Sequence, residues 1–246
     1  MIRVLQINVG VCRAAQDLAL ASAAEKNIDV IVFSEQYRDR DEENGWYADA
    51  SGRAAIVVLS GQHIQAVGPH QLGFRWIQMN RHRLYSCYCS PNVTLSDFED
   101  FLSALETSVR SSPVPTIITG DFNAKSREWG SPREDNRGKA LADLSTSLGL
   151  IVCNQGQPTF VRGASKSHID LTFAKRSTTC WVDGWKVLDE ESLSLHNCIE
   201  FSVKTTSQRG QETSTRRGWA YRRLDQGKLI KALKRDARPV APAAED

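Results

Sequence analysis

The chain contains 246 residues, of which 41% are hydrophobic and 24% are charged, and its formal net charge at pH 7 is +2. This share of apolar side chains is sufficient to bury one substantial core. No apolar run is long enough to cross a membrane, which argues against a membrane-spanning chain. The six cysteines form no Cys-x-x-Cys pair, so a structural zinc site is not expected, and their dispersal fits a reducing, intracellular environment.

Apolar patterns along the chain predict an α/β fold. Runs and alternations predict strands at residues 4–7, 30–33, 54–60, 74–79, 83–89, 116–119, 180–188, 193–195 and 198–203, with a further strand near Ile169. Patterns with a period near 3.6 predict helices at about residues 14–26, 97–110 and 137–148. Cys87 and Cys89 are expected to pack as small hydrophobes. His63, His70 and His82 have no partner pattern and are expected at the surface or in loops.

Polar side chains occur at or beside the ends of six predicted strands. In chain order they are Asn8, Glu35, Tyr88, Asp121 with Asn123, Asp170, and His196. Proteins of the α/β class place their chemistry at the ends of strands. We therefore expect these side chains to converge on one polar site at an edge of the sheet core.

Each of these side chains, taken singly, also has an ordinary structural explanation. Asp and Asn favour turns, so Asp121 and Asn123 could be turn residues. Glu35 could be a solvated strand end, His196 a core histidine and Tyr88 a packed strand residue. Taken together, they predict catalysis. A carboxylate and an amide two residues apart can accept a proton from water and hold that water in place, beside a hard-cation ligand and a charged histidine.

The same residues resemble the endonuclease/exonuclease/phosphatase family, which includes apurinic endonucleases, DNase I and the endonucleases of non-LTR retrotransposons. The resemblance runs from about Ile2 to Val203, and its most specific motif is Gly120-Asp121-Phe122-Asn123. A second block resembles the retrotransposon branch; it comprises Trp129-Gly130, Asn136-Arg137-Gly138, Leu148-Gly149-Leu150, Asn154 and Pro158-Thr159-Phe160. Within that branch the chain is most similar to arthropod elements that insert at a fixed site in ribosomal RNA genes. The implied fold is a DNase I-like four-layer α/β sandwich of two packed mixed β-sheets flanked by helices.

The resemblance also implies roles at the metal and the water. Glu35, helped by Asn8, would hold a divalent metal. Asp121 would activate or position the attacking water, and Asn123 would orient that water and the phosphate. Glutamate and asparagine oxygens favour Mg²⁺ or Mn²⁺ over zinc, so Mg²⁺ is the expected cofactor, with Mn²⁺ as a substitute.

Around the phosphate, the resemblance implies five further roles. His196 would contact the scissile phosphate and stabilise its developing charge, and Asp170 would orient His196 and keep it protonated. Tyr88 would lie near the phosphate or the leaving oxygen. Ser167 and Asn92 would contact the phosphate from the sides.

The chain departs from the family pattern at two acidic positions. Many members have Asp directly before the final histidine, where this chain has Leu195, and some have an acidic residue where it has Gly10. The change at Leu195 removes a carboxylate near the metal and weakens a two-metal mechanism, whereas Gly10 is also found in other retrotransposon relatives. We therefore expect a single, loosely held Mg²⁺.

Charge divides the chain in two. Residues 1–203 carry 20 Lys/Arg and 24 Asp/Glu, a net charge of −4, whereas residues 204–246 carry 11 and 5, a net charge of +6. The acidic part must hold DNA through local groups, and the candidates include Lys125, Arg137, Arg162 and Lys166. Residues 162–166 are predicted to form a hairpin tip, which in retrotransposon endonucleases enters a DNA groove; an ordinary turn is the alternative.

The expected domains are an endonuclease at residues 1–204 and a basic linker or tail at residues 205–246. The resemblance implies that a reverse transcriptase follows in the same polypeptide. It also implies a nuclear, Mg²⁺-dependent, site-selective endonuclease that nicks one strand of duplex DNA, with ribosomal RNA genes as the expected target. The resulting 3′-hydroxyl would prime reverse transcription. The alternatives are another phosphoesterase of this fold, such as a repair nuclease or lipid phosphatase, and a catalytically impaired DNA-binding module.

Overall fold

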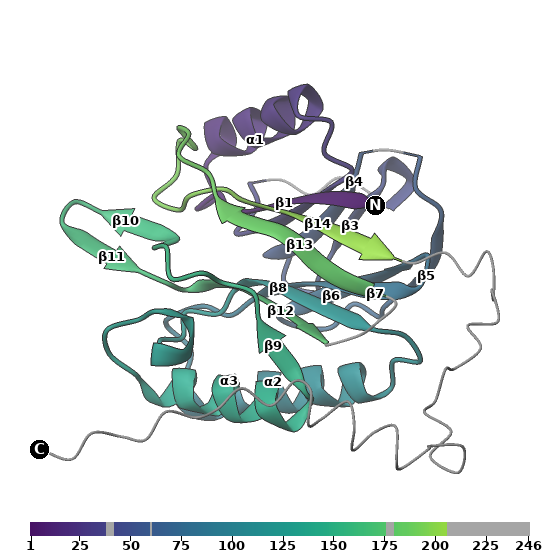
Figure 1. The fold of residues 1–246 in the computed structure, drawn as a ribbon. Coiled ribbons are helices and arrows are strands. Elements are labelled where there is room, and N and C mark those ends of the chain that lie inside the picture. The colour runs from purple at the N-terminus through teal and green to yellow at the C-terminus, as the bar shows by residue number, and fades with distance from the viewer. Residues whose placement is uncertain (38–41, 60, 176–179, 206–246) are drawn as a thin grey trace, which may run out of the picture. The chain divides into compact units, whose positions relative to one another are not determined.

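The computed structural model describes residues 1–37, 42–59, 61–175 and 180–205, and within them two mixed β-sheets pack face to face (Figure 1). Helix α1 (Arg13–Glu25) covers the outer face of one sheet, and helices α2 (Leu95–Arg110) and α3 (Asn136–Ser147) cover the outer face of the other. The predicted α/β class and the DNase I-like sandwich of sheets flanked by helices are confirmed. The predicted tail at 205–246 lies outside the described residues apart from Thr205.

The first sheet places two parallel strands at its centre. In spatial order its described strands are β13 (Cys180–Val187), β14 (Ile199–Thr205), β1 (Ile2–Asn8), β2 (Val30–Ser34), β4 (Ala54–Val58) and β3 (Trp46–Ala48). Strands β1 and β2 are parallel, and Asn8 pairs with Ser34 at their ends. Because parallel strands end at the same edge, residues just after β1 and β2 come together.

The second sheet repeats this arrangement. In spatial order its described strands are β5 (Ile64–Val67), β6 (Phe74–Met79), β7 (His82–Tyr88), β8 (Thr116–Asp121), β12 (Asp170–Lys175) and β9 (Leu150–Val152). Strands β7 and β8 are parallel and end at the pair Tyr88 and Asp121. Strand β12 is antiparallel to β8, so its first residue, Asp170, pairs with Asp121. Five of the predicted polar positions therefore lie at or directly after the ends of two pairs of parallel strands, one pair in each sheet, and at the start of β12.

Apolar side chains fill three layers. One cluster lies between the sheets and includes Val4, Val32, Ile77 and Ile117. A second packs α2 (Leu95–Arg110) and α3 (Asn136–Ser147) against β7, β8 and β12. Helix α2 begins with a capping box, in which Thr94 Oγ1 accepts from Asp97 N–H and the Asp97 carboxylate accepts from Thr94 N–H. The motif fixes the start of the helix directly after the loop that follows β7.

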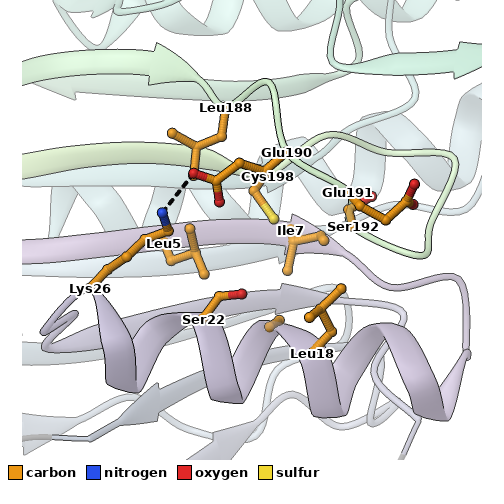
Figure 2. A pocket seen from close by; sticks show the side chains of 11 residues that line it. Leu5, Ile7, Leu18, Ser22, Lys26, Leu188, Glu190, Glu191, Ser192 and Cys198 are labelled. Carbon is orange, nitrogen blue, oxygen red and sulfur yellow. Dashed lines mark hydrogen bonds and ion pairs between the residues drawn. The ribbon is translucent and has the colours of Figure 1, made fainter.

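Helix α1 (Arg13–Glu25) packs through its alanines on Leu5 and Ile7 of β1. Figure 2 shows the small pocket at this contact, where an ion pair joins Lys26 Nζ to Glu190 Oε1 across 2.7 Å. Its volume of about 10 Å³ leaves room for no more than a single water molecule. The contact therefore serves packing and not ligand binding.

Most predicted elements are present, and the differences have physical reasons. Residues 193–195 were expected as a strand but form a bend with Leu193 at φ 54°. His82 was expected at the surface or in a loop, yet it is fully buried at the start of β7. The sequence pattern also missed β3, β5 and β9, and these strands have only three or four residues each.

Cys87 and Cys89 pack in the core, as predicted, and all six cysteines are free thiols. No helix among the described residues is long and apolar enough to span a membrane.

The turn predicted at residues 162–166 is the tip of an antiparallel hairpin formed by β10 (Phe160–Arg162) and β11 (Ser165–Ser167). Gly163 occupies the turn at φ 58°, a left-handed conformation that glycine adopts without strain. Figure 1 shows the hairpin projecting from the sandwich. The prediction of a hairpin tip is confirmed.

Candidate active site

The polar site lies where the ends of β1, β2, β7 and β8 meet. The Asn8 amide joins the two sheets here: its Nδ2 donates to Glu35 Oε2 at 3.2 Å and to Asp121 Oδ2 at 2.8 Å. Asn8 Oδ1 accepts from Gly10 N–H at 2.8 Å, which fixes the orientation of the amide. Two carboxylates from opposite sheets are thus held on one side chain.

The motif after β8 is shaped by close packing. A Cβ on Gly120 would lie 1.9 Å from the carbonyl oxygen of Cys87, so only glycine lets β7 and β8 approach this closely. Asn123 is left-handed, at φ 47°; its N–H donates to Asp121 Oδ1, and its Nδ2 donates to the Cys89 carbonyl. Glu35 is also left-handed, at φ 48°. Non-glycine residues with positive φ are uncommon and concentrate at functional sites.

His196 and Asp170 form a buried pair beside Asp121. His196 Nδ1 lies 2.8 Å from Asp170 Oδ2, and the bend before the histidine is braced by two serines. Ser192 Oγ donates to the His196 carbonyl, and Ser194 Oγ donates to the carbonyl of Asn8. His196 therefore follows a bend that is fixed by hydrogen bonds, and not the strand that was predicted at residues 193–195.

Burial and neighbouring charges set the protonation states. Burial raises the pKa of Asp121 to about 7, together with the charge of Asp170, while His196 and the Asn8 amide oppose the rise. Burial works against a charged His196, but Asp170 above all, then Asp121 and Glu35, raise its pKa to about 9. Burial, followed by a hydrogen bond to Glu35, raises the pKa of Tyr88 well above its usual range. Near pH 8 the site therefore combines a carboxylate, an imidazolium and a neutral phenol.

The donor set suits a hard divalent cation. Glu35 is about a quarter exposed and Asp121 is buried, and the same amide contacts both carboxylates. Ligand atoms of Asp121, Asp170 and His196 also lie within 4.8 Å of one another. His196 Nδ1 and Asp170 Oδ2 are bonded to each other, whereas Glu35 and Asp121 bring carboxylate oxygens together at the Asn8 amide. Oxygen donors of this kind favour Mg²⁺ or Mn²⁺. Asn8 presents its nitrogen toward the carboxylates, and its role as a ligand stays a prediction.

The predicted phosphate and DNA contacts are spread around this centre. Asn92, Tyr88 and Glu35 line an open groove of about 600 Å³. Arg162 and Lys166 are exposed on the hairpin, Ser167 is half-buried at its base, and Lys125 is exposed after the Asp121 motif. Arg137 is engaged differently, because its Nη2 donates to the carbonyls of Ser90 and Val93. Its guanidinium lies over the Phe98 ring, which gives it a structural role whatever else it contacts.

The structure adds residues to which the sequence analysis gave no role. Arg53 Nη1 lies 3.9 Å from Glu35 Oε1, and Phe160 packs on His196 with ring centroids 4.9 Å apart. Thr159 is fully buried beside Asp170. Phe160 and Thr159 belong to the Pro-Thr-Phe stretch quoted for the family resemblance, so a signal existed for them. No sequence signal marked Arg53, because it lies 18 residues after Glu35 and belongs to none of the motifs quoted above.

The chain is similar to known proteins in sequence and in fold. Residues 82–200 match the family model described as "Endonuclease-reverse transcriptase". No curated protein matches the chain. Among solved structures, the chain is similar to the endonuclease domain of TRAS1, a telomere-specific non-LTR retrotransposon, with 26% identity and a TM-score of 0.70. That match covers 84% of this chain and 100% of the other.

Two further structures show the same fold. The 3′ phosphatase NExo from Neisseria, bound to a product DNA hairpin, has 16% identity and a TM-score of 0.64, covering 82% of this chain and 99% of that one. An AP endonuclease from Archaeoglobus fulgidus has 14% identity and a TM-score of 0.60, with the same coverage of 82% and 99%. These two similarities show the fold, whereas the family model and the match to the TRAS1 domain support a DNA endonuclease.

Proposed function

We propose that this chain is an Mg²⁺-dependent endonuclease of the endonuclease/exonuclease/phosphatase family and that it nicks one strand of duplex DNA. The observation that carries the proposal is the meeting of Glu35, Asp121 and the Asp170–His196 pair at one edge of two sheets. A bound Mg²⁺ would polarise the phosphate and stabilise charge on its oxygens. Glu35 is the carboxylate that would hold it, with Asp121 beside it on the Asn8 amide.

The residues divide the remaining work. Asp121, once deprotonated, accepts a proton from the attacking water, and Asn123 orients that water through its amide oxygen. The His196 imidazolium donates a hydrogen bond to the phosphate and stabilises its developing negative charge. Tyr88 stays neutral because its pKa is raised, so its hydroxyl can donate a hydrogen bond to the phosphate or to the leaving 3′-oxygen, which takes up a proton from solvent as it departs. Asp170 keeps His196 charged and oriented.

The product of this chemistry is a free 3′-hydroxyl, which suits the priming of reverse transcription. In the proposal, the chain acts on chromosomal DNA in the nucleus, and a reverse transcriptase in the same polypeptide extends the nick. Ribosomal RNA genes are the target that the sequence resemblance favours, whereas the similar TRAS1 domain is described as telomere-specific. Mapping the nicks decides between these targets.

The first test is nicking of supercoiled plasmid in Mg²⁺, in Mn²⁺ and in EDTA. We expect metal-dependent nicking that is lost in Asp121→Ala and His196→Ala and kept in Asp143→Ala and His63→Ala, whose side chains are exposed and far from the site. Extension of the nicks by a polymerase would show the 3′-hydroxyl, and sequencing would locate them.

Parallel assays keep the alternatives distinct. Release of phosphate from a 3′-phosphorylated DNA hairpin, or from phosphoinositides or sphingomyelin, without nicking would replace the proposal with another phosphoesterase of this fold. Folded wild-type protein that binds DNA and hydrolyses none of these substrates would be the impaired binding module.

A further inference from the structure

The base of the β10–β11 hairpin is bonded directly to the Asp170–His196 pair. Phe160 pairs with Ser167 on one side and with His196 on the other. Two hydrogen bonds of 2.8 Å flank the second pairing, from Val161 N–H to the Leu195 carbonyl and from Asn197 N–H to the Thr159 carbonyl. The hairpin and the bend that carries His196 therefore form one hydrogen-bonded unit.

Thr159 fixes the other member of the pair. Its side chain is fully buried, and its Oγ1 accepts from Ile169 N–H at 3.2 Å and from Asp170 N–H at 3.1 Å. Its own N–H donates to the Ser167 carbonyl at 2.9 Å. The backbone of Asp170 also pairs with Asp121 of β8, and its carbonyl accepts from Asn154 Nδ2 at 2.9 Å. The Thr159 hydroxyl is the contact that ties this backbone to the foot of the hairpin.

Phe160 limits the position of the imidazole. Its ring meets that of His196 edge to face, with centroids 4.9 Å apart and an interplanar angle of 67°. Asp170 holds the histidine through Oδ2, while its Oδ1 is buried with no hydrogen-bond partner among the described residues. A carboxylate with one bond of this kind depends on its backbone and on the packing around its partner to stay aligned.

We propose that Thr159 and Phe160 are positioning residues that align the Asp170–His196 pair, so that the hairpin belongs to the catalytic apparatus as well as to the DNA-contacting surface. This inference rests on the proposed nuclease function for its kinetic consequence. Arg162 lies two residues beyond Phe160, and Lys166 lies one residue before Ser167. DNA bound at the hairpin tip would therefore contact the same hydrogen-bonded unit that holds His196 in place. Loss of the alignment slows the chemical step and leaves DNA affinity intact.

Thr159→Val tests the proposal, because valine keeps the shape of threonine and removes the acceptor. We expect kcat for nicking to fall by roughly 10- to 100-fold with little change in KM, since small displacements of catalytic groups carry costs of this order. Thr159→Ser restores the oxygen and should restore kcat. Thr116→Val is the matched control: Thr116 is equally buried but lies at the opposite end of β8. Phe160→Leu should lower kcat less than Phe160→Ala.

A spectroscopic measurement separates positioning from stability and from nuclease activity. In wild type, the His196 Nδ1–H proton bonded to Asp170 should give a downfield NMR resonance, which Thr159→Val should broaden or shift upfield and Thr159→Ser should keep. An unchanged resonance and kcat in folded Thr159→Val would overturn the proposal, as would equal losses in Thr116→Val. If wild type fails to nick any DNA, the proposed function falls, while the resonance still tests the alignment.

Discussion

At the scale of single residues, the electrostatics of His196 predict the alkaline limit of activity. Asp170, Asp121 and Glu35 raise its pKa to about 9, so the imidazolium persists through neutral pH and is lost as pH rises through about 9. We expect nicking at saturating Mg²⁺ to decline over that range. Asp170→Asn removes the largest favourable charge and should move the decline to lower pH.

Initial rates from pH 6.5 to 10 provide the measurement, with Asp143→Asn as a control that leaves the profile unchanged. A decline at the same pH in wild type and in Asp170→Asn would show that the charge on His196 does not limit the reaction.

His82 gives a second prediction at this scale, on stability. It is fully buried, neither ring nitrogen has a partner among the described residues, and burial lowers its pKa from 6.5 to about 4. Between about pH 6.5 and pH 4, the unfolded chain therefore binds a proton at His82 that the folded chain does not bind. The contribution of neutral His82 to stability is present above pH 6.5 and is lost as pH falls toward 4, by up to about 3 kcal/mol.

Urea unfolding at pH 7.5 and pH 5 checks this prediction. His82→Leu should lose less stability between the two pH values than wild type does, whereas His63→Leu, at an exposed site, should follow wild type. Equal losses in wild type and His82→Leu would contradict it. The sequence could not reveal this histidine, because its burial arises from sheet packing and no motif marks it.

At the scale of elements, the two ends of the β10–β11 hairpin have different expected roles: the tip contacts DNA, and the base positions the catalytic His196. Arg162 and Lys166 are exposed and form no ion pair with the described residues, so both are free to contact phosphates. Arg162→Ala and Lys166→Ala should each weaken DNA binding uniformly across sequences. Each should also reduce the slope of log K against log salt by about 0.9, the value for one phosphate contact.

Shortening the tip between Arg162 and Ser165, with Phe160 and Ser167 kept, should relax the choice of nick site while kcat on plasmid stays near the wild-type value. Sequenced nick positions on a fixed target duplex give the answer. Unchanged positions would remove the hairpin from site selection, and a collapse of kcat would mean that the tip, and not the base alone, supports His196.

The sequence predicted strands and helices where the apolar pattern was long, and most of those elements are found. It placed Asp121 correctly because an apolar run leads straight into it, and Tyr88, Asn8 and Glu35 for the same reason. It failed at residues 193–195, where alternation suggested a strand but Leu193 is left-handed and two serines brace a bend. Bonds between distant segments, such as Thr159 to Asp170, are tertiary and leave no periodic trace.

At the scale of the whole molecule, sheet order decides where the chain can be cut. Strand β14 lies between β13 and β1, pairs with both, and supplies Ile199, Phe201 and Val203 to the core between the sheets. A fragment of residues 1–205 keeps that strand, whereas a fragment of residues 1–198 loses it. We therefore expect the longer fragment to melt at the temperature of the full chain and the shorter one to be unfolded.

A cut after residue 205 also separates the candidate active site from the most basic part of the chain. Residues 206–246 carry ten Lys/Arg and five Asp/Glu, while the acidic remainder holds every residue assigned to the site. The fragment of residues 1–205 should therefore nick plasmid with an unchanged kcat, bind DNA more weakly at low salt, and show a shallower salt dependence than the full chain. Circular dichroism melting, nicking and filter binding measure the three expectations. Loss of nicking in the folded fragment would instead place part of the active site in the basic segment, and identical salt slopes would exclude that segment from DNA binding.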